Sequence, residues 1–158
     1  MSEDRQFVDI YSAFPNGMKA MVALEEACQA GSLEPFLYEL VKMRSSQING
    51  CAYCLDMHYK DARAMGETEE RLYMLNAWRE ATIYTEAERA ALALTEEITK
   101  VSEHHVSLEV EKEARKYFDE TSYANLIFLI VVINSWNRLA ISSHSPAGKY
   151  KSTKKKIK

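Results

Sequence analysis

A run of eight consecutive apolar residues, Leu126 to Ile133, constrains the fold of this 158-residue chain more than any other feature. The run is far shorter than the ~20 residues that cross a lipid bilayer. It lies within a segment that we expect to be helical from about Thr121 or Ser122 to Ile141. A helix that is apolar on nearly all sides must be covered by its own protein or by another subunit. The sequence therefore predicts either the central core helix or part of a subunit interface, and we expect a homo-oligomer.

Helix signals recur along the whole chain, and no segment has the pattern of a credible strand. Gly31 and Gly66 lie where left-handed helix C-caps are expected, and Pro35 suits a first helical turn. Thr85 and Glu88 have the spacing of a capping box. The expected helices are Met18–Ala30, a helix opened by Ser32 and Pro35 that ends before Asn49, Cys51–Met65, Thr68–Trp78, Thr85–Lys100, Ser107–Phe118 and the apolar helix already described.

These signals predict an all-α protein, a compact bundle of about six to seven helices in one domain over residues 1–148. Hydrophobic residues make up 47% of the chain, which is ample for a core. The formal net charge is only −3, so nothing in the charge balance indicates nucleic acid or an anionic membrane as a partner. Residues 149–158 hold six lysines, and removing these charges from the total leaves −9 on the rest. We expect this basic segment to be a flexible, solvated tail, and the alternative is an arm that binds phosphate or acidic groups.

The first residues, Met1 to Arg5, are acidic and are not followed by an apolar segment. A secretory signal is therefore not expected, and the sequence predicts a cytoplasmic protein. In that compartment structural thiols are kept reduced, so a closely spaced cysteine pair indicates catalysis or metal binding rather than a static crosslink.

Such a pair is present as Cys51 and Cys54, followed by His58. On a helix these three side chains share one stripe, because residues three and four apart are neighbours. Glu39 lies twelve residues upstream, at the border of the apolar face of the preceding helix. The combination of two thiols, a base and a carboxylate at this spacing is much rarer than a cysteine pair alone. It indicates thiol redox chemistry.

The thiolate is the reactive form of cysteine, and a free thiol with a pKa of about 8.5 is mostly protonated at neutral pH. The first turn of a helix offers unpaired N–H groups and a positive dipole end, which favour the Cys51 and Cys54 anions. His58 is placed to take the Cys54 proton directly or through a water. Glu39 could orient His58 or a bound water and relay protons to Cys51. Once one thiol is oxidised, the spacing allows the pair to close a disulfide.

Two simpler interpretations of the cysteines remain open. A zinc site could use Cys51, Cys54 and His58, with a fourth ligand from another histidine. The cysteines could also be inert core residues, which is what we expect of Cys28 among its apolar neighbours. Tyr53 either shapes access to the thiols or simply packs. The candidate fourth zinc ligands are His104, His105 and His144, and the polar residues that could line a pocket after the apolar run are Asn134, Trp136, Asn137 and Arg138.

The constellation of Glu39, Cys51, Cys54 and His58 resembles the alkylhydroperoxidase D-like proteins (AhpD-like proteins) of the carboxymuconolactone decarboxylase superfamily, in their short, single-repeat form. The resemblance covers roughly residues 15 to 145. It also rests on three further segments, Arg44 to Cys54 with Asp56-Met57-His58, Leu75 to Glu80, and Asn134 to Arg138.

The resemblance implies an AhpD-like helical fold, hydroperoxide or disulfide reductase activity without a bound cofactor, and assembly into trimers or hexamers. It implies that Cys54 attacks the peroxide, Cys51 resolves, His58 is the base and Glu39 orients the relay through Cys51. Helix position alone instead favours Cys51 as the attacking thiol. The implied partners are a hydroperoxide and a lipoylated or thioredoxin-like dithiol donor. Where the best-studied enzymes carry a histidine between the cysteines, this chain has Tyr53.

Two alternatives to a peroxidase follow from the same residues. In the first, the protein is a non-catalytic redox sensor or partner-binding protein whose disulfide alters its assembly. In the second, it is a lactone decarboxylase, which we rank lower because that branch of the superfamily does not need the cysteine pair. Repeated turnover of tert-butyl hydroperoxide with a dithiol donor separates catalysis from sensing.

Overall fold

The computed structural model describes residues 8–157, and this part of the chain is all-helical, with no strand. The all-α prediction is therefore confirmed. The N-terminal residues Met1 to Arg5, for which no secretory signal is predicted, lie outside the described part. The elements are α1 (Ile10–Ala13), α2 (Pro15–Gln29), α3 (Pro35–Asn49), α4 (Ala52–Met65), α5 (Glu69–Met74), the 3₁₀ turn η1 (Leu75–Ala77), α6 (Glu86–Thr99), α7 (Leu108–Ala114) and α8 (Glu120–Ser142).

Local capping explains most of these boundaries. Helix α2 begins at Pro15, earlier than expected, because proline is accepted at the first helical position. The capping box of Thr85 and Glu88 opens α6 as predicted. Helix α7 ends at Ala114 instead of Phe118, because the next residues form turns. In these turns the N–H groups of Lys116 and Tyr117 bond to carbonyls three residues earlier. The short helix α1 was not expected, and the carboxylate of Asp9 caps it.

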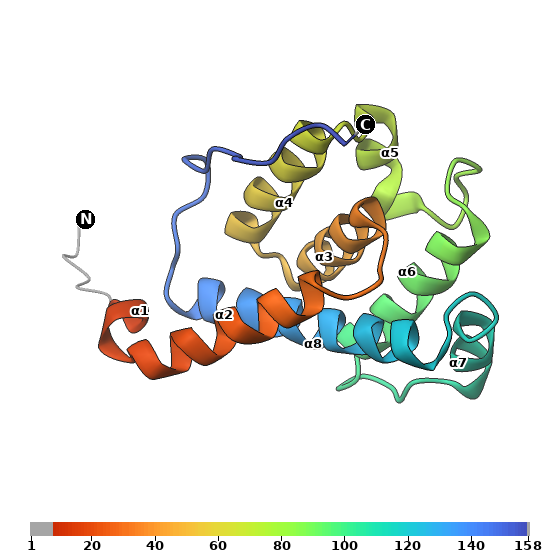
Figure 1. Ribbon diagram of the computed structural model, residues 1–158, viewed down its shortest axis with the longest axis horizontal. Coiled ribbons are helices and arrows are strands. Elements are labelled where there is room, and N and C mark those ends of the chain that lie inside the picture. Colours follow the sequence, from red (N-terminus) through yellow and green to blue (C-terminus); the bar gives the residue numbers. More distant parts are fainter. Residues whose placement is uncertain (1–7, 158) are drawn as a thin grey trace.

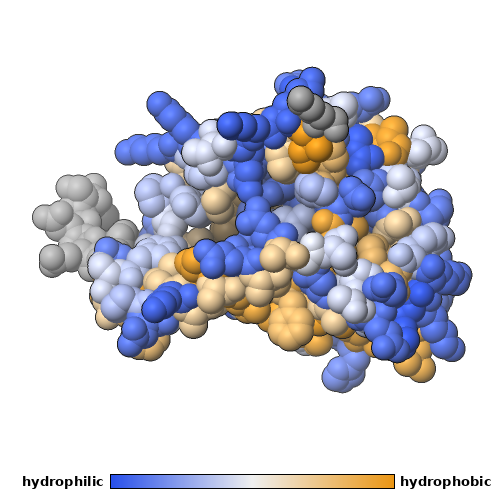
Figure 2. Space-filling view, viewed as in Figure 1, coloured by the Kyte–Doolittle hydropathy of each residue, from blue (hydrophilic) through white to orange (hydrophobic). Residues whose placement is uncertain are grey.

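Helix α8 is the core helix that its apolar run predicts, and it packs against α3 and runs beside α2 along one side of the molecule (Figure 1). Leu126, Leu129 and Ile130 are fully buried on one side of it. On its other side Phe128 is 55% exposed and Val131 is 43% exposed. Figure 2 shows apolar surface along the edge that α2 and α8 form. The core position is thus observed, whereas the subunit interface and the homo-oligomer stay predictions.

Among the described helices only α8 is long and apolar enough to meet a length and composition test for a membrane span. Core helices of soluble proteins meet the same test, and 39% of its most apolar stretch is buried inside this structure.

The chain after α8 returns along α4 and ends near α5 (Figure 1). Its backbone is bonded at both ends of this path. Gly148 N–H donates to Asp56 at 2.9 Å, and Ile157 N–H donates to the Met65 carbonyl at 2.9 Å. The mobility of residues 149–158 stays a prediction, but the structure places residues 149–157 against α4.

Candidate functional site

A cavity of about 660 Å³ lies between α2, α3, α4, the end of α8 and the C-terminal segment. Most of its lining is apolar. Figure 2 shows the face of the molecule on which the C-terminal segment passes along α4. The apolar lining includes Met18, Tyr53, Met57, Trp136, Ala140 and Pro146. The polar lining includes Glu25, Glu39, Lys42, Cys54, His58 and Asp61. Three buried or half-buried carboxylates therefore share one cavity with a sulfur and an imidazole.

The two cysteines stand at the start of α4 and are joined as a disulfide, with their Cα atoms 5.4 Å apart. Cys51 is the N-cap residue, and its sulfur accepts a hydrogen bond of 3.3 Å from the backbone N–H of Cys54. Each cysteine is 1% exposed to solvent. Cys54 lines the cavity and Cys51 does not, although both pack against Ala140 of α8. A small molecule in the cavity therefore meets Cys54 first.

His58 and Glu39 form a buried pair across α4 and α3. Nδ1 of His58 lies 2.8 Å from Oε2 of Glu39, and the residues are 5% and 4% exposed. A carboxylate at Nδ1 favours the tautomer in which that nitrogen carries the proton and Nε2 is a free base. Because His58 also lines the cavity one turn after Cys54, the imidazole is placed to exchange protons with groups there.

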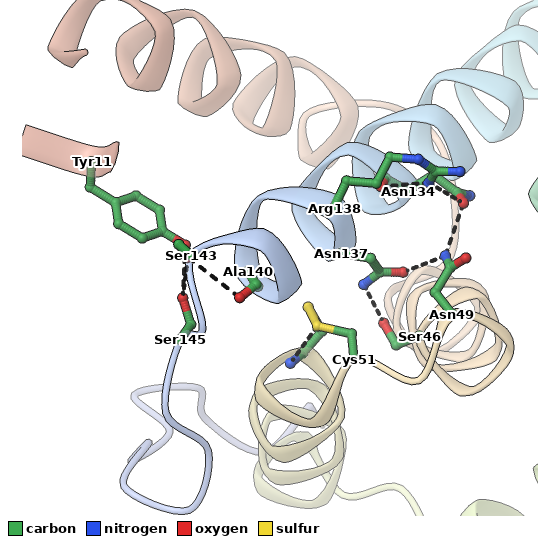
Figure 3. The surroundings of a disulfide bond; sticks show 11 residues. Tyr11, Ser46, Asn49, Cys51, Asn134, Asn137, Arg138, Ala140, Ser143 and Ser145 are labelled. Carbon is green, nitrogen blue, oxygen red and sulfur yellow. Dashed lines mark hydrogen bonds between the residues drawn. A yellow bond between two sulfur atoms is a disulfide. The ribbon is translucent and has the colours of Figure 1, made fainter. Parts of the chain in front are cut away.

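A buried amide network fixes the turn between α3 and α4 to α8 (Figure 3). The Asn49 side chain donates to Asn137 at 2.8 Å and to Asn134 at 3.0 Å. Asn137 in turn donates to the Ser46 hydroxyl at 2.9 Å and is fully buried. Gly50 supplies the left-handed C-cap of α3, with φ of 68°, immediately before the cysteines. The network therefore holds the N-terminus of α4, and with it the disulfide, in place.

A second polar cluster stands on the side of the cavity formed by α2, α3 and α8. Glu25 accepts hydrogen bonds from Tyr38 at 2.5 Å, from Trp136 Nε1 at 3.0 Å, and from the Lys42 ammonium. Burial alone would raise the pKa of the Glu25 carboxyl, but the Lys42 charge and these hydrogen bonds outweigh it and hold the pKa below 4.5. The same contacts raise the pKa of the Tyr38 phenol, through burial first and its bond to Glu25 second.

The third carboxylate, Asp61, is paired with the C-terminal segment. The Tyr150 hydroxyl lies 2.9 Å and 3.1 Å from its two oxygens, and Lys60 donates to the Tyr150 carbonyl at 2.9 Å. Burial and then the bond to Asp61 raise the pKa of Tyr150 to about 12. Residue 150 thus ties the C-terminal segment to α4 at the cavity wall.

The structure brings together all four residues singled out from the sequence. Glu39, Cys54 and His58 line the cavity, and Cys51 lies directly behind Cys54. Cys28 is a buried free thiol in the main core, as expected, and burial raises its pKa.

The histidines considered as a fourth zinc ligand lie in the loop between α6 and α7 and just after α8. Within residues 8–157, no group of three or more His, Cys, Asp or Glu side chains has an arrangement suited to a metal ion.

Sequence reasoning missed Glu25, Lys42 and Asp61. One signal was present: Lys42 follows Glu39 by three residues, so both lie on the same face of their helix. No local pattern links Glu25 or Asp61 to the cysteines. Of the polar residues that follow the apolar run, Trp136 does line the cavity, whereas Asn134 and Asn137 tie α8 to α3.

Comparison with known proteins gives consistent matches. The model of the carboxymuconolactone decarboxylase family matches residues 15–97. The uncharacterized protein YdfG of Bacillus subtilis (strain 168) is 45% identical over 137 residues, covering 87% of this chain and 93% of that protein.

Solved structures share the fold. A protein of unknown function from Agrobacterium tumefaciens, ATU0492, suggested to be the antioxidant defence protein AhpD, is 35% identical with a TM-score of 0.86. The match covers 90% of this chain and 98% of that one. The debrominase Bmp8 in complex with 2,3,4-tribromopyrrole is 22% identical with a TM-score of 0.78, over 87% of this chain and 74% of its own. This second likeness concerns the fold alone.

Proposed function

The chain belongs to the carboxymuconolactone decarboxylase family, and we propose that it is a thiol-dependent oxidoreductase that reduces organic hydroperoxides with its Cys51–Cys54 pair. One observation carries this proposal: a buried pair of Glu39 and His58, 2.8 Å apart, lines the same cavity as the sulfur of Cys54. Such an arrangement joins a nucleophile, a base and a group that orients the base. The name given to the ATU0492 structure agrees with an antioxidant role.

The reaction starts from the dithiol form. His58 accepts the Cys54 proton, directly or through a water, and the thiolate attacks the outer oxygen of the hydroperoxide. The O–O bond breaks, the alcohol leaves with the proton held by His58, and Cys54 becomes a sulfenic acid. The Cys51 thiol then attacks that sulfur and releases water, which gives the disulfide. A dithiol donor, lipoylated or thioredoxin-like, restores both thiols and is itself oxidised to a disulfide.

The position of the two cysteines supports Cys54 as the attacking thiol. It lines the cavity and lies one helical turn before His58, whereas Cys51 does not contribute to the cavity lining. Cys51 is placed to resolve, because the backbone already holds the two sulfurs within bonding range. Glu39 orients His58 in this scheme, and the observed contact joins it to the imidazole rather than to Cys51.

Single-cysteine variants test the proposal. We expect Cys54→Ser to abolish hydroperoxide consumption, because a serine hydroxyl is far too weak an acid for His58 to activate alone. Cys51→Ser should react once and retain a sulfenic acid on Cys54, which a sulfenic-acid trap and mass spectrometry detect. Trap labelling of Cys51 in the Cys54→Ser protein would reverse the assigned roles. Wild-type protein that oxidises once and is not recycled by a dithiol donor would favour the sensing alternative.

We also propose that the protein is a cytoplasmic homo-oligomer, a trimer or hexamer, which covers the exposed apolar side of α8. Phe128 and Val131 of α8 and Val22 of α2 are each more than 40% exposed in the single chain. Light scattering should give a mass several times 18.1 kDa at micromolar concentration. A species of 18.1 kDa alone would contradict the assembly without affecting the thiol chemistry.

A further inference from the structure

We propose that the cavity binds organic molecules with an apolar body and a carboxylate head, and that the ammonium of Lys42 holds the head. The inference rests on the proposed function in one respect, since it takes the cavity as the place where substrate binds. It concerns a residue that takes no part in the thiol relay.

Lys42 is a buried cation with unused donors. It is 3% exposed and lines the cavity, and within residues 8–157 its ammonium donates a hydrogen bond to Glu25 and lies over the Tyr38 ring, 4.5 Å from the ring centre. A lysine ammonium carries three N–H donors, so two have no oxygen or nitrogen acceptor in the protein. The ring face attracts the cation but is a weaker partner than an acceptor oxygen, and a buried charge without full pairing is costly. A ligand that brings an acceptor to this point therefore gains more than one that brings a donor.

The carboxylate beside Lys42, in contrast, is already engaged, because Glu25 accepts from three side chains, one of which is Lys42 itself. Glu39 and Asp61 have one side-chain partner each, His58 and Tyr150. At Lys42 the spare groups are therefore N–H donors, which favour an anionic or strongly accepting head group at this point.

Two more cations stand where the C-terminal segment borders the cavity. Lys149 and Lys154 both contribute to its lining, and neither forms an ion pair with any residue from 8 to 157. Together with Lys42, these lysines balance the three carboxylates of the lining, whereas the rest of the chain is acidic. The cavity therefore repels an anionic ligand less than the rest of the molecule does.

The remainder of the cavity suits an apolar body. Its volume of about 660 Å³ falls within the ~300–1,000 Å³ typical of small-molecule sites. Tyr53, Met57 and Trp136 supply aromatic and thioether surface. Lys42 follows Glu39 by about one helical turn on α3, so a head group bound to Lys42 would lie near the pair formed by Glu39 and His58. The apolar chain of that ligand would extend into the cavity that Cys54 also lines.

The test compares octanoate with 1-octanol, which share a chain and differ in the head. Binding to the disulfide form is measured by titration calorimetry, so no thiol reaction takes part. We expect wild-type protein to bind octanoate more tightly than 1-octanol by at least about tenfold, as a charge-assisted hydrogen bond implies. In Lys42→Met, the affinity for octanoate should be no more than about three times the affinity for 1-octanol. Lys112→Met is the matched control, because Lys112 is an exposed lysine of α7 outside the cavity lining.

Equal binding of octanoate and 1-octanol by wild-type protein would overturn the proposal, even if Lys42→Met failed to fold. An octanoate preference that survives in Lys42→Met but is lost in the Lys149→Met/Lys154→Met protein would place the head at the C-terminal segment and overturn the role of Lys42. Failure of peroxide turnover would leave these binding ratios unchanged, so the two proposals fail separately.

Discussion

Two glutamates of the same cavity, Glu39 and Glu25, differ in how they are bonded. Glu39 is the more deeply buried, with 5% of its side chain exposed, and its one observed hydrogen-bond partner is the imidazole of His58. Glu25 keeps 24% of its side chain exposed and accepts hydrogen bonds from Lys42, Tyr38 and Trp136. The deeper acid has fewer partners, and its partner is an imidazole, a side chain that can act as a general base.

The difference in bonding indicates a role in proton transfer for Glu39 and a structural role for Glu25. A carboxylate bonded to an imidazole can stabilise the imidazolium that forms when the base takes a proton. A carboxylate bonded to an ammonium and two fixed donors has no proton to exchange near neutral pH, and it joins α2, α3 and α8 at one point. We therefore expect changes at Glu39 to affect rate, and changes at Glu25 to affect stability.

The largest expected effect is on rate at Glu39. Glu39→Gln keeps the size of the side chain but removes the charge that supports His58, so hydroperoxide consumption should fall by about 100-fold. A stopped-flow assay with tert-butyl hydroperoxide measures this change. The matched control is Glu26→Gln, at an exposed position of α2, which should keep the wild-type rate. Equal rates for Glu39→Gln and wild type would remove Glu39 from the relay.

The next effect is on stability at Glu25. Glu25→Gln leaves the Lys42 ammonium buried without its anion, which should lower the free energy of unfolding by about 2 kcal/mol after allowance for partial exposure. Urea unfolding followed by circular dichroism measures the loss. Glu39→Gln should cost less, since the imidazole N–H can still donate to the amide oxygen. A larger loss at Glu39 than at Glu25 would invert the comparison.

The stabilisation by the ion pair of Glu25 and Lys42 should also depend on pH. The pKa of Glu25 is lowered in the folded protein, so its stabilising contribution is complete above its ordinary value of 4.5 and is lost as the pH falls through the folded value. The difference in unfolding free energy between wild type and Glu25→Gln should therefore shrink below pH 4.5. Urea unfolding at pH 7 and in acid measures it. A difference that stays constant would show that the pair does not depress this pKa.

The smallest expected effect concerns the third carboxylate. Tyr150→Phe removes the hydroxyl bonded to Asp61 and should lower the free energy of unfolding by about 1 kcal/mol. The pKa of Tyr150 is raised from 10.0 to about 12, so its contribution is complete below pH 10 and is lost as the pH rises toward 12. The gap between wild type and Tyr150→Phe should close over that range. A gap that persists in alkali would mean that the hydroxyl does not stabilise the segment.

Much of the fold and part of the site could be predicted from the sequence, because the signals are local. The capping box of Thr85 and Glu88, the C-cap at Gly66 and the apolar run of α8 all act within a few residues, and the structure has helices where these signals place them. The stripe of Cys51, Cys54 and His58 is likewise a property of one helix.

What the tertiary structure decided is which residues from distant segments meet at the cavity. Trp136 and Glu25 are 111 residues apart, and Tyr150 and Asp61 are 89 residues apart, so no local pattern pairs them. Lys42 shares a helix face with Glu39 in the sequence, but its burial depends on α8, which packs against α3, and its partner is Glu25 of α2. The sequence by itself determined the helices and the dithiol stripe, because backbone bonding and capping act over short range. The tertiary structure chose the partners of Glu39, Glu25 and Asp61, because burial depends on contacts between helices.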